Sequence, residues 1–325
     1  MHRLHEMFPE LLEALPAIWL GAPPTPVRRL EGLGGDVWLK DEGAYGDGGW
    51  GGNKVRKLEW LIPEAHRRQK ETIVTVGGLG TNWGLACALY GSEHGLETVL
   101  ALIDQPVDEH VEAQQERLRA SGAEIHLTGT KTRTVVSVPW LLASHRKSWF
   151  LPAGGSSPVG ALGAVEIALE LAAQVEAGEI PEPSYVVTAV GSGGTAAGLV
   201  LGLELAGLGT KVLGVVVNDT LDLGSKALLR LTRKSARLLS DRGADLPDLD
   251  LSGRNLVVVE DQIGDGYGHK TRAGTRAASR ASKKADLDLD PVYTAKAMAG
   301  LLELVEGGGR AEGPIVFLDT NGPRP

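Results

Sequence analysis

The stretch Gly51-Gly52-Asn53-Lys54-Val55-Arg56-Lys57-Leu58-Glu59 decides how this chain is organised. It ends a glycine-rich segment, residues 46–52, which predicts a flexible loop because glycine adopts backbone conformations that other residues avoid. Asn53 is a favourable N-cap, so a helix is expected to begin there. Apolar side chains then recur at helical spacing, at Val55, Leu58, Leu61, Ile62 and Ala65. The stretch therefore predicts an amphipathic helix entered from a loop.

Three cations, Lys54, Arg56 and Lys57, crowd the first turn of this predicted helix. The helix dipole disfavours each of them there by about 0.3–1 kcal/mol, so a bound anion or a chemical task should offset the cost. Lys54 and Lys57 are three residues apart and share a face, so one could react while the other holds a phosphate. A lysine beside other cations loses its proton more easily and can form a Schiff base. Spacing alone leaves an exposed basic helix start as the alternative.

A second polar segment follows the predicted buried strand of residues 72–76. Its sequence is Gly77-Gly78-Leu79-Gly80-Thr81-Asn82-Trp83, and a helix over residues 84–94 is expected next. A strand, a glycine turn and a helix start form the crevice where α/β folds bind ligands. Thr81 and Asn82 would point into that crevice, although Thr81 could equally serve as a helix cap.

A third segment, Gly191-Ser192-Gly193-Gly194-Thr195-Ala196-Ala197-Gly198, follows a predicted central strand at residues 185–190. Glycines let the backbone close around a phosphate, which the N–H groups of the helix start can bind. The same residues also satisfy the dinucleotide fingerprint G-x-G-x-x-G/A, with Asp219 as a late candidate for its acidic residue. A nicotinamide-dependent oxidoreductase is therefore a distant alternative.

The stretch at residues 51–59 resembles the cofactor-lysine motif of the D-cysteine desulfhydrase and 1-aminocyclopropane-1-carboxylate deaminase family. Asp290-Pro291-Val292-Tyr293-Thr294-Ala295-Lys296-Ala297-Met298 resembles a second motif of that family. The resemblance implies a pyridoxal 5′-phosphate (PLP) enzyme of α/β fold type II, similar to the tryptophan synthase β chain. It implies two three-layer αβα domains with mostly parallel sheets. Residues 1–56 with 166–325 would form the large PLP-binding domain and residues 57–165 the smaller inserted one, with the active site in the cleft between them.

The resemblance also implies residue roles. Lys54 would be the Schiff-base lysine and shuttle the α-proton of the substrate, and Asn82 would bind the phenolic oxygen of the cofactor. Thr81, where relatives usually carry serine, would take part in proton transfer or bind the substrate carboxylate. Tyr267 and Tyr293 would be active-site tyrosines. Thr294 would face the pyridine nitrogen, where a hydroxyl resembles the desulfhydrase branch. The residues implied to hold the phosphate are Lys57, Ser192, Gly193, Gly194 and Thr195.

The expected reaction is α,β-elimination or deamination of a small amino acid, such as D-cysteine, with release of ammonia and a 2-oxo acid. Two departures from the family motifs keep an alternative open, namely PLP-dependent β-replacement or a specialised biosynthetic reaction. Trp83 stands where relatives carry Gln or His and would take up pocket volume, and residues 319–325 replace a His-Thr-Gly-Gly loop. A third possibility is a binding protein that keeps the fold without turnover.

Bulk properties suit a soluble enzyme. The chain has 325 residues, 42% hydrophobic and 23% charged, and its net charge of −8 gives no support for nucleic-acid binding. No run is long or apolar enough to predict a membrane span. The single cysteine, Cys87, lies in an apolar run and is predicted to be a core residue, in keeping with a cytoplasmic location. No histidine spacing predicts a metal site, and the family implies a homodimer.

Overall fold

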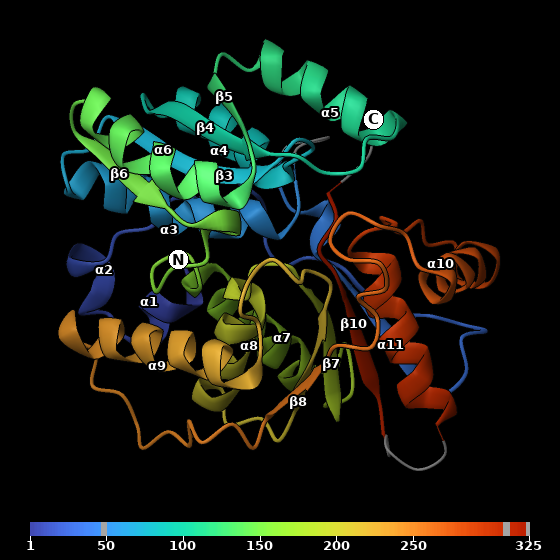
Figure 1. Cartoon of the computed structure of the whole chain (residues 1–325). Helices are drawn as coiled ribbons and strands as arrows, with labels where there is room; N and C mark the ends of the chain where they lie inside the picture. Colours follow the sequence, from blue (N-terminus) through green and yellow to red (C-terminus); the bar gives the residue numbers. More distant parts are fainter. Residues whose placement is uncertain (47–50, 308–312, 323–325) are drawn as a thin grey trace.

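The fold consists of two mainly parallel sheets, each flanked by helices (Figure 1). The structure is a computed structural model that describes residues 1–46, 51–307 and 313–322. Within these residues, a six-stranded sheet has the order β1–β2–β10–β7–β8–β9 and a four-stranded sheet the order β5–β4–β3–β6. The strands are β1 (Val27–Arg29), β2 (Val37–Asp41), β3 (Thr72–Gly78), β4 (Glu97–Ile103), β5 (Glu124–Gly129), β6 (Ser148–Leu151), β7 (Tyr185–Val190), β8 (Lys211–Val216), β9 (Leu256–Val259) and β10 (Ile315–Asp319).

The helices cover both faces of each sheet. In the described residues they are α1 (Arg3–Met7), α2 (Leu11–Ala14), α3 (Asn53–Arg67), α4 (Asn82–Glu93), α5 (Glu109–Ala120), α6 (Lys131–Ser144), α7 (Leu162–Glu176), α8 (Gly194–Leu205), α9 (Ser225–Asp241), α10 (Arg272–Ala285) and α11 (Thr294–Glu306), with 3-10 turns η1 (Glu42–Ala44) and η2 (Ala153–Gly155). This confirms the predicted α/β fold with two three-layer domains. The exact boundaries proposed for those domains remain a prediction.

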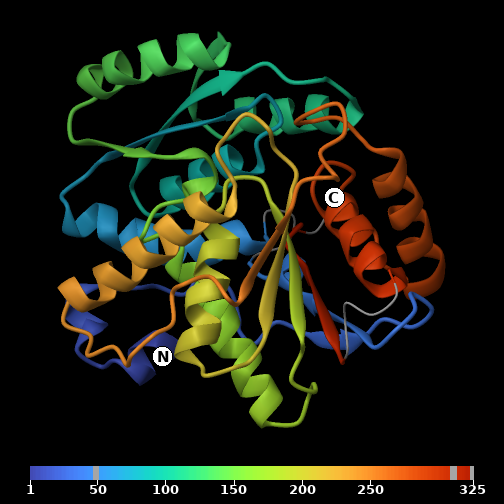
Figure 2. The ribbon, with the colours of Figure 1, turned by 60° about the horizontal axis from the view of Figure 1, so that its bottom comes forward.

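Alternation along β10 shows how the large domain forms its layers. Ile315 and Phe317 pack with α10 and α11, whereas Val316 and Leu318 pack on the other face with α7, α8 and α9. Both faces of the strand are buried, which explains its unbroken apolar sequence. Figure 2 shows the two groups of helices on opposite sides of the sheet. The three layers therefore form because helices cover both faces of the sheet to which this apolar strand belongs.

The small sheet is built in the same way. Val99 packs with Leu141 of α6, and Leu100 packs with Leu85 of α4 and Leu118 of α5. Neither α6 nor β6 was predicted from the sequence. Within the described residues, no helix is long and apolar enough to cross a membrane.

The predicted N-cap at Asn53 is wrong. Gly52 occupies the cap position with φ of +92°, a left-handed conformation that favours glycine, and Asn53 is the first helical residue. A side chain on Gly52 would meet the backbone oxygen of Thr320. The preceding loop prediction falls partly on residues 47–50, which lie outside the described residues.

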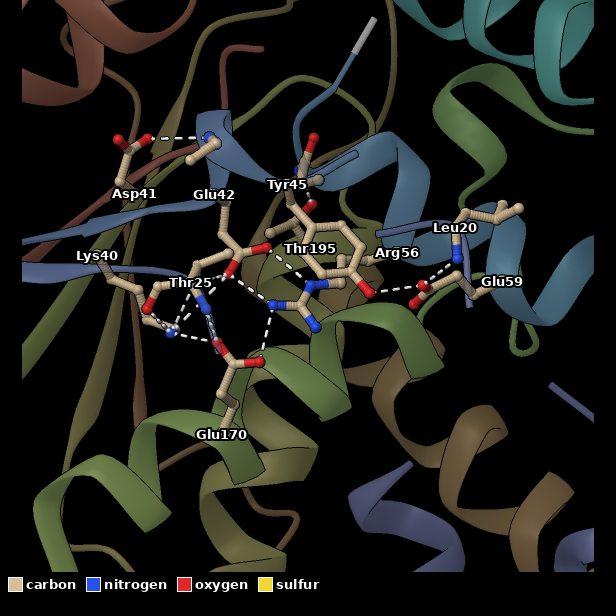
Figure 3. Close-up of polar contacts among 12 residues, drawn as sticks. Leu20, Thr25, Lys40, Asp41, Glu42, Tyr45, Arg56, Glu59, Glu170 and Thr195 are labelled. Carbon is tan, nitrogen blue, oxygen red and sulfur yellow. Dashed lines mark hydrogen bonds and ion pairs between the residues drawn. The ribbon is translucent and has the colours of Figure 1, made fainter. Parts of the chain in front are cut away.

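A buried cluster of four charges fixes α3 in the large domain (Figure 3). The Arg56 guanidinium donates to Glu42 at 3.0 Å and to Glu170 of α7 at 2.8 Å. Lys40 of β2 donates to the other oxygen of Glu170 at 2.6 Å. The Arg56 guanidinium also stacks 3.6 Å from the centre of the Tyr45 ring. The cluster joins β2, η1, α3 and α7, and its two positive and two negative charges balance.

We predict that Glu170→Ala destabilises the protein by about 3–5 kcal/mol, because it leaves Lys40 and Arg56 buried with fewer partners. Urea unfolding measures the change in the free energy of unfolding. Asp241→Ala is the control, because it breaks the exposed pair with Arg237 and should cost less than about 0.5 kcal/mol. Equal effects of the two variants would show that the buried cluster has no special importance.

Candidate active site

The carboxyl ends of strands from both sheets open onto one cavity, which is where parallel α/β sheets bind ligands. It lies between the start of α3, the end of β3, η2 and the glycine turn after β7. Its lining includes predicted site residues from all parts of the chain, namely Lys54, Lys57, Thr81, Asn82, Ser192, Gly193, Thr195, Tyr267 and Tyr293. The structure thus brings together residues that lie far apart in the sequence.

Lys54 lies in the first turn of α3 and its side chain is half-buried. Burial lowers the pKa of its ammonium group, while the carboxylates of Asp290 and Asp319 act in the opposite direction. Its Nζ lies 6.0 Å from the centre of the Tyr293 ring. A lowered pKa increases the fraction of neutral amine, which is the form that attacks a carbonyl carbon.

Lys57 lies one turn further along and is 4% exposed. Its Nζ donates to the carbonyl oxygen of Gly154 at 2.8 Å and faces Gly194 at the start of α8. Burial, together with the neighbouring charge of Lys54, lowers the pKa of Lys57 to about 7. An anion in the cavity would favour its charged form, so Lys57 is suited to hold a phosphate. The alternative of an exposed basic helix start is wrong.

The start of α8 faces the same cavity. Gly193 has φ of +90°, which allows the turn from β7 into α8. Ser156 accepts a hydrogen bond from the Gly194 amide at 2.9 Å and donates to Ser192 at 2.9 Å. Hydroxyl and N–H groups at a helix start form an anion site. Gly194 does not itself line the cavity, and its amide is already used by the Ser156 hydroxyl.

Asn53 is a residue whose importance the sequence did not reveal. Its amide donates to the Thr195 hydroxyl at 2.7 Å, and its Oδ1 is buried without a hydrogen-bond partner among the described residues. Asn218 and Thr320 also line the cavity without having been predicted. For Asn53, the available signal was its position directly before Lys54.

Thr81, Asn82 and Trp83 form the wall at the start of α4. Thr81 caps this helix, since its hydroxyl oxygen accepts the Gly84 amide at 3.1 Å. Trp83 lines the cavity but its indole N–H is turned to Thr75, at 2.9 Å. The large side chain is therefore anchored to β3, and its one donor is used there.

Tyr267 and Tyr293 form a pair on the opposite wall. Their hydroxyl oxygens are 2.5 Å apart. Burial raises the pKa of both phenols, and that of Tyr293 lies well above 10. Both phenols therefore stay protonated at neutral pH and can donate a proton or a hydrogen bond.

Thr294 differs from the expectation in its placement. It is not among the residues that line the cavity, and its hydroxyl accepts the backbone amide of Asp290 at 2.8 Å. The carboxylate of Asp290 in turn accepts the amides of Val292 and Tyr293. Thr294 thus organises the turn that presents Tyr293, and its contact with a pyridine nitrogen remains a prediction.

Cys87 and the histidines take no part in this site. Cys87 is fully buried and burial raises its thiol pKa, which confirms the predicted core position. In the part of the chain that the structure describes, no group of three or more His, Cys, Asp or Glu side chains is placed to hold a metal ion.

The chemistry of this donor set fits pyridoxal 5′-phosphate. Lys54 offers an amine for the aldehyde of the cofactor, and Lys57 with the start of α8 offers donors for its phosphate. The unpartnered Oδ1 of Asn53 supplies a further polar atom in the same wall. The fold and this site define a PLP-dependent enzyme of fold type II.

Comparison with known proteins gives the same class. Residues 18–320 match the family model for pyridoxal-phosphate dependent enzymes, and the chain belongs to that family. A D-cysteine desulfhydrase of Klebsiella pneumoniae strain 342 is 31% identical over 326 residues, covering 96% of this chain and 95% of the relative. Its counterpart in Salmonella newport strain SL254 is 32% identical with the same coverage.

Solved structures agree. A crystal structure described as an ACC deaminase homologue has a TM-score of 0.81 and 28% sequence identity, and covers 97% of this chain and 95% of its own. The processed form of threonine deaminase isoform 2 from Solanum lycopersicum has a TM-score of 0.66 at 17% identity, a likeness of fold alone. That match covers 98% of this chain and 85% of the deaminase chain. The nicotinamide alternative is therefore wrong. Asp219, which it required, accepts the backbone amide of Tyr267 at 3.0 Å.

Lys57 predicts a pH dependence of stability for the cofactor-free protein. Its folded-state pKa of about 7 lies below the ordinary value of 10.5, so the unfolded chain binds more protons between these limits. The penalty of burying the charge is complete below pH 7 and disappears as pH rises towards 10.5. Relative to Lys57→Met, the wild type should therefore gain stability between about pH 7 and pH 10. Urea unfolding of both proteins across that range measures the difference, and parallel curves would contradict the prediction.

Proposed function

We propose that the protein catalyses PLP-dependent α,β-elimination or deamination of a small amino acid, such as D-cysteine, and releases ammonia and a 2-oxo acid. The observation that carries the proposal is the one cavity in which Lys54 meets the residues at the start of α8 and the Tyr267–Tyr293 pair. The relatives named D-cysteine desulfhydrase and ACC deaminase homologue support this reaction class. A homodimer in the cytoplasm also remains part of the proposal.

The bound cofactor would supply an electron sink for the bonds at the α-carbon of the substrate. Lys54 would hold the cofactor and then, as a free amine, accept the α-proton at Nζ. Lys57, Ser192 and Gly193 would hold the phosphate, together with the Gly194 amide, which would exchange its hydrogen bond with Ser156 for one to the phosphate. Asn82 would bind the phenolic oxygen, and Thr195 would be held in place by Asn53.

The remaining residues would act on the substrate. The Thr81 hydroxyl oxygen is occupied by the Gly84 amide, which leaves its hydrogen available for a substrate carboxylate. The two phenols would donate a proton to the departing group, because both are neutral at physiological pH. β-Replacement is less well supported, because the relatives found are named D-cysteine desulfhydrase and ACC deaminase homologue.

Loss of the amine tests the central role of Lys54. Lys54→Arg keeps a positive charge but removes the nucleophile, so release of ammonia and 2-oxo acid should fall at least about 1,000-fold. A panel of D- and L-amino acids with good β-leaving groups provides the substrates. Lys226→Arg on the exposed face of α9 is the matched control and should keep full activity. Turnover by Lys54→Arg at the wild-type rate would reject the assignment.

The tyrosine pair generates a separate prediction. Tyr293→Phe removes a proton donor whose ring centre lies 6.0 Å from the Lys54 Nζ, and it should lower kcat by about 100-fold to 10,000-fold. Tyr185→Phe in β7 is the control for the same chemical change and should leave kcat unchanged. If Tyr293→Phe kept wild-type kcat, the phenol would have no role in proton transfer.

A further inference from the structure

An apolar groove leads directly out of the candidate active site. It shares six lining residues with the cavity around Lys54, namely Val76, Gly77, Gly78, Ala153, Asn218 and Tyr267. Beyond these it continues between α6, the ends of β4 and β6, and the loop after β8. It encloses about 1020 Å³, counted with its open mouth. The groove is therefore an annex of the reaction site and not a separate surface feature.

The walls of this annex are mainly aliphatic and aromatic. Its own lining residues include Ile103, Val135, Val138, Phe150 and Leu221. Among the described lining residues, Lys131 carries the only charge, and its Nζ is turned to the carbonyl oxygen of Thr220 at 2.7 Å. Val135 is 65% exposed and Phe150 36% exposed, so apolar surface faces water beside the reacting groups. Such a patch at the mouth of a cavity indicates a binding site for an apolar group.

We propose that the annex binds the apolar β-substituent of the amino-acid substrate, which makes S-alkyl- and S-arylcysteines the substrate class. This proposal rests on the proposed elimination reaction. Free cysteine would fill only the cavity around Lys54, whereas a hydrocarbon group on its sulfur would reach past Gly78 and Tyr267 into the annex. Binding that group would remove its apolar surface, and that of Val138 and Phe150, from water.

Water is the only reactant that this elimination needs besides the substrate. The α-proton leaves to Lys54, and the Cβ–S bond breaks with its electron pair remaining on sulfur. The thiolate receives a proton from the tyrosine pair and departs as a thiol, and the proton held by Lys54 then restores the phenol. Addition of one water to the three-carbon product then gives pyruvate and ammonium. The Tyr267 phenol lines both the cavity and the annex, so it stands where the thiolate would form.

The test compares kcat/KM for S-benzylcysteine and for unsubstituted cysteine, each in both configurations. The kcat/KM of the wild type should be at least about tenfold higher for S-benzylcysteine, because burial of the aromatic ring removes apolar surface from water. Val138→Asp places a charge in the annex and should lower the ratio of the two kcat/KM values at least about tenfold. Val136→Asp is the matched control, because Val136 is on the same helix, is 72% exposed and does not line the annex.

The outcomes separate the two proposals. If the protein turned over cysteine but not S-benzylcysteine, or if Val138→Asp left the ratio of the two kcat/KM values unchanged, the proposed role of the annex would be wrong. The proposed elimination reaction would still hold. Turnover of neither compound would overturn the elimination reaction itself. An equal effect of Val136→Asp, with a change in elution volume on size exclusion, would show that this face joins two copies of the chain and would also overturn the annex.

A second inference comes from a chain of hydrogen bonds that runs from Arg117 through Gln114 to Asn82 at the cavity. Arg117 of α5 donates from Nη1 to Oε1 of Gln114 at 3.3 Å. Nε2 of Gln114, which is 3% exposed, then donates to Oδ1 of Asn82 at 2.8 Å. Arginine has donors only, so it fixes the oxygen of Gln114 towards itself. The oxygen of Asn82 is used in turn, and its NH₂ group is left to face the cavity.

The geometry points to Gln114 as a positioning residue that makes Asn82 a hydrogen-bond donor towards the cavity. A donor at this place suits a negatively charged oxygen such as the phenolate of the cofactor. Gln114→Glu keeps the size of the side chain and strengthens the contact with Arg117, but it offers Asn82 only acceptors. Asn82 would then turn its NH₂ group to residue 114 and its oxygen to the cavity. The polarity of the site would be reversed without loss of volume.

Two spectroscopic measurements on the purified protein test this reversal. Gln114→Glu should raise the dissociation constant for pyridoxal 5′-phosphate at least about tenfold and shift the pH at which its visible absorption changes. Gln115→Glu is the control, because Gln115 contacts the exposed Arg119 on the same helix. Gln114→Met, which cannot reverse the amide, should have a smaller effect than Gln114→Glu. Unchanged affinity and absorption in Gln114→Glu, or an equal shift in Gln115→Glu, would overturn the inference.

Discussion

Four buried charges hold the helix that carries the reactive lysine. Arg56, two residues after Lys54, is clamped between Glu42 and Glu170, and Lys40 completes the balance. Because these partners come from η1, α7 and β2, the first turn of α3 is fixed against three separate elements. Lys54 and Lys57, which are three residues apart on this helix, both line the cavity. The cationic first turn, unfavourable for an isolated helix, is therefore a consequence of how the site is held.

Much of the fold was predictable because the strands of both sheets are covered on two faces. The strand at residues 185–190 was predicted with the bounds that the structure shows, and the strand at residues 72–76 was predicted two residues shorter than β3. Continuous apolar runs bounded by glycine turns give a clear signal of this kind. The glycine turn after β7 and the Thr81–Asn82 segment were each expected to bind a ligand because they follow a strand. Only the family resemblance assigned both to one cofactor, since β7 and β3 belong to different sheets.

The remainder could not be predicted because it depends on contacts between distant segments. Asn53 has the sequence signature of an N-cap, but the positive φ of Gly52 shifts the cap by one residue and frees Asn53 to reach Thr195. The direction of the Trp83 indole depends on Thr75 in a neighbouring strand. The hydrogen bond from Gln114 to Asn82 joins residues that are 32 positions apart, and no local sequence pattern predicts it. Propensity and periodicity describe elements, whereas these features arise from packing between elements.

The identity of the cofactor-bearing lysine is the claim that one measurement tests most directly. Lys57 is the competitor, since its pKa of about 7 also leaves a neutral amine near the cavity. The measurement is the visible absorption of the purified protein before and after borohydride reduction, followed by mapping of the pyridoxyl adduct by mass spectrometry. The account predicts a visible band that bleaches and an adduct on Lys54, both lost in Lys54→Ala. An adduct on Lys57, or a protein to which pyridoxal 5′-phosphate gives no visible band, would contradict it.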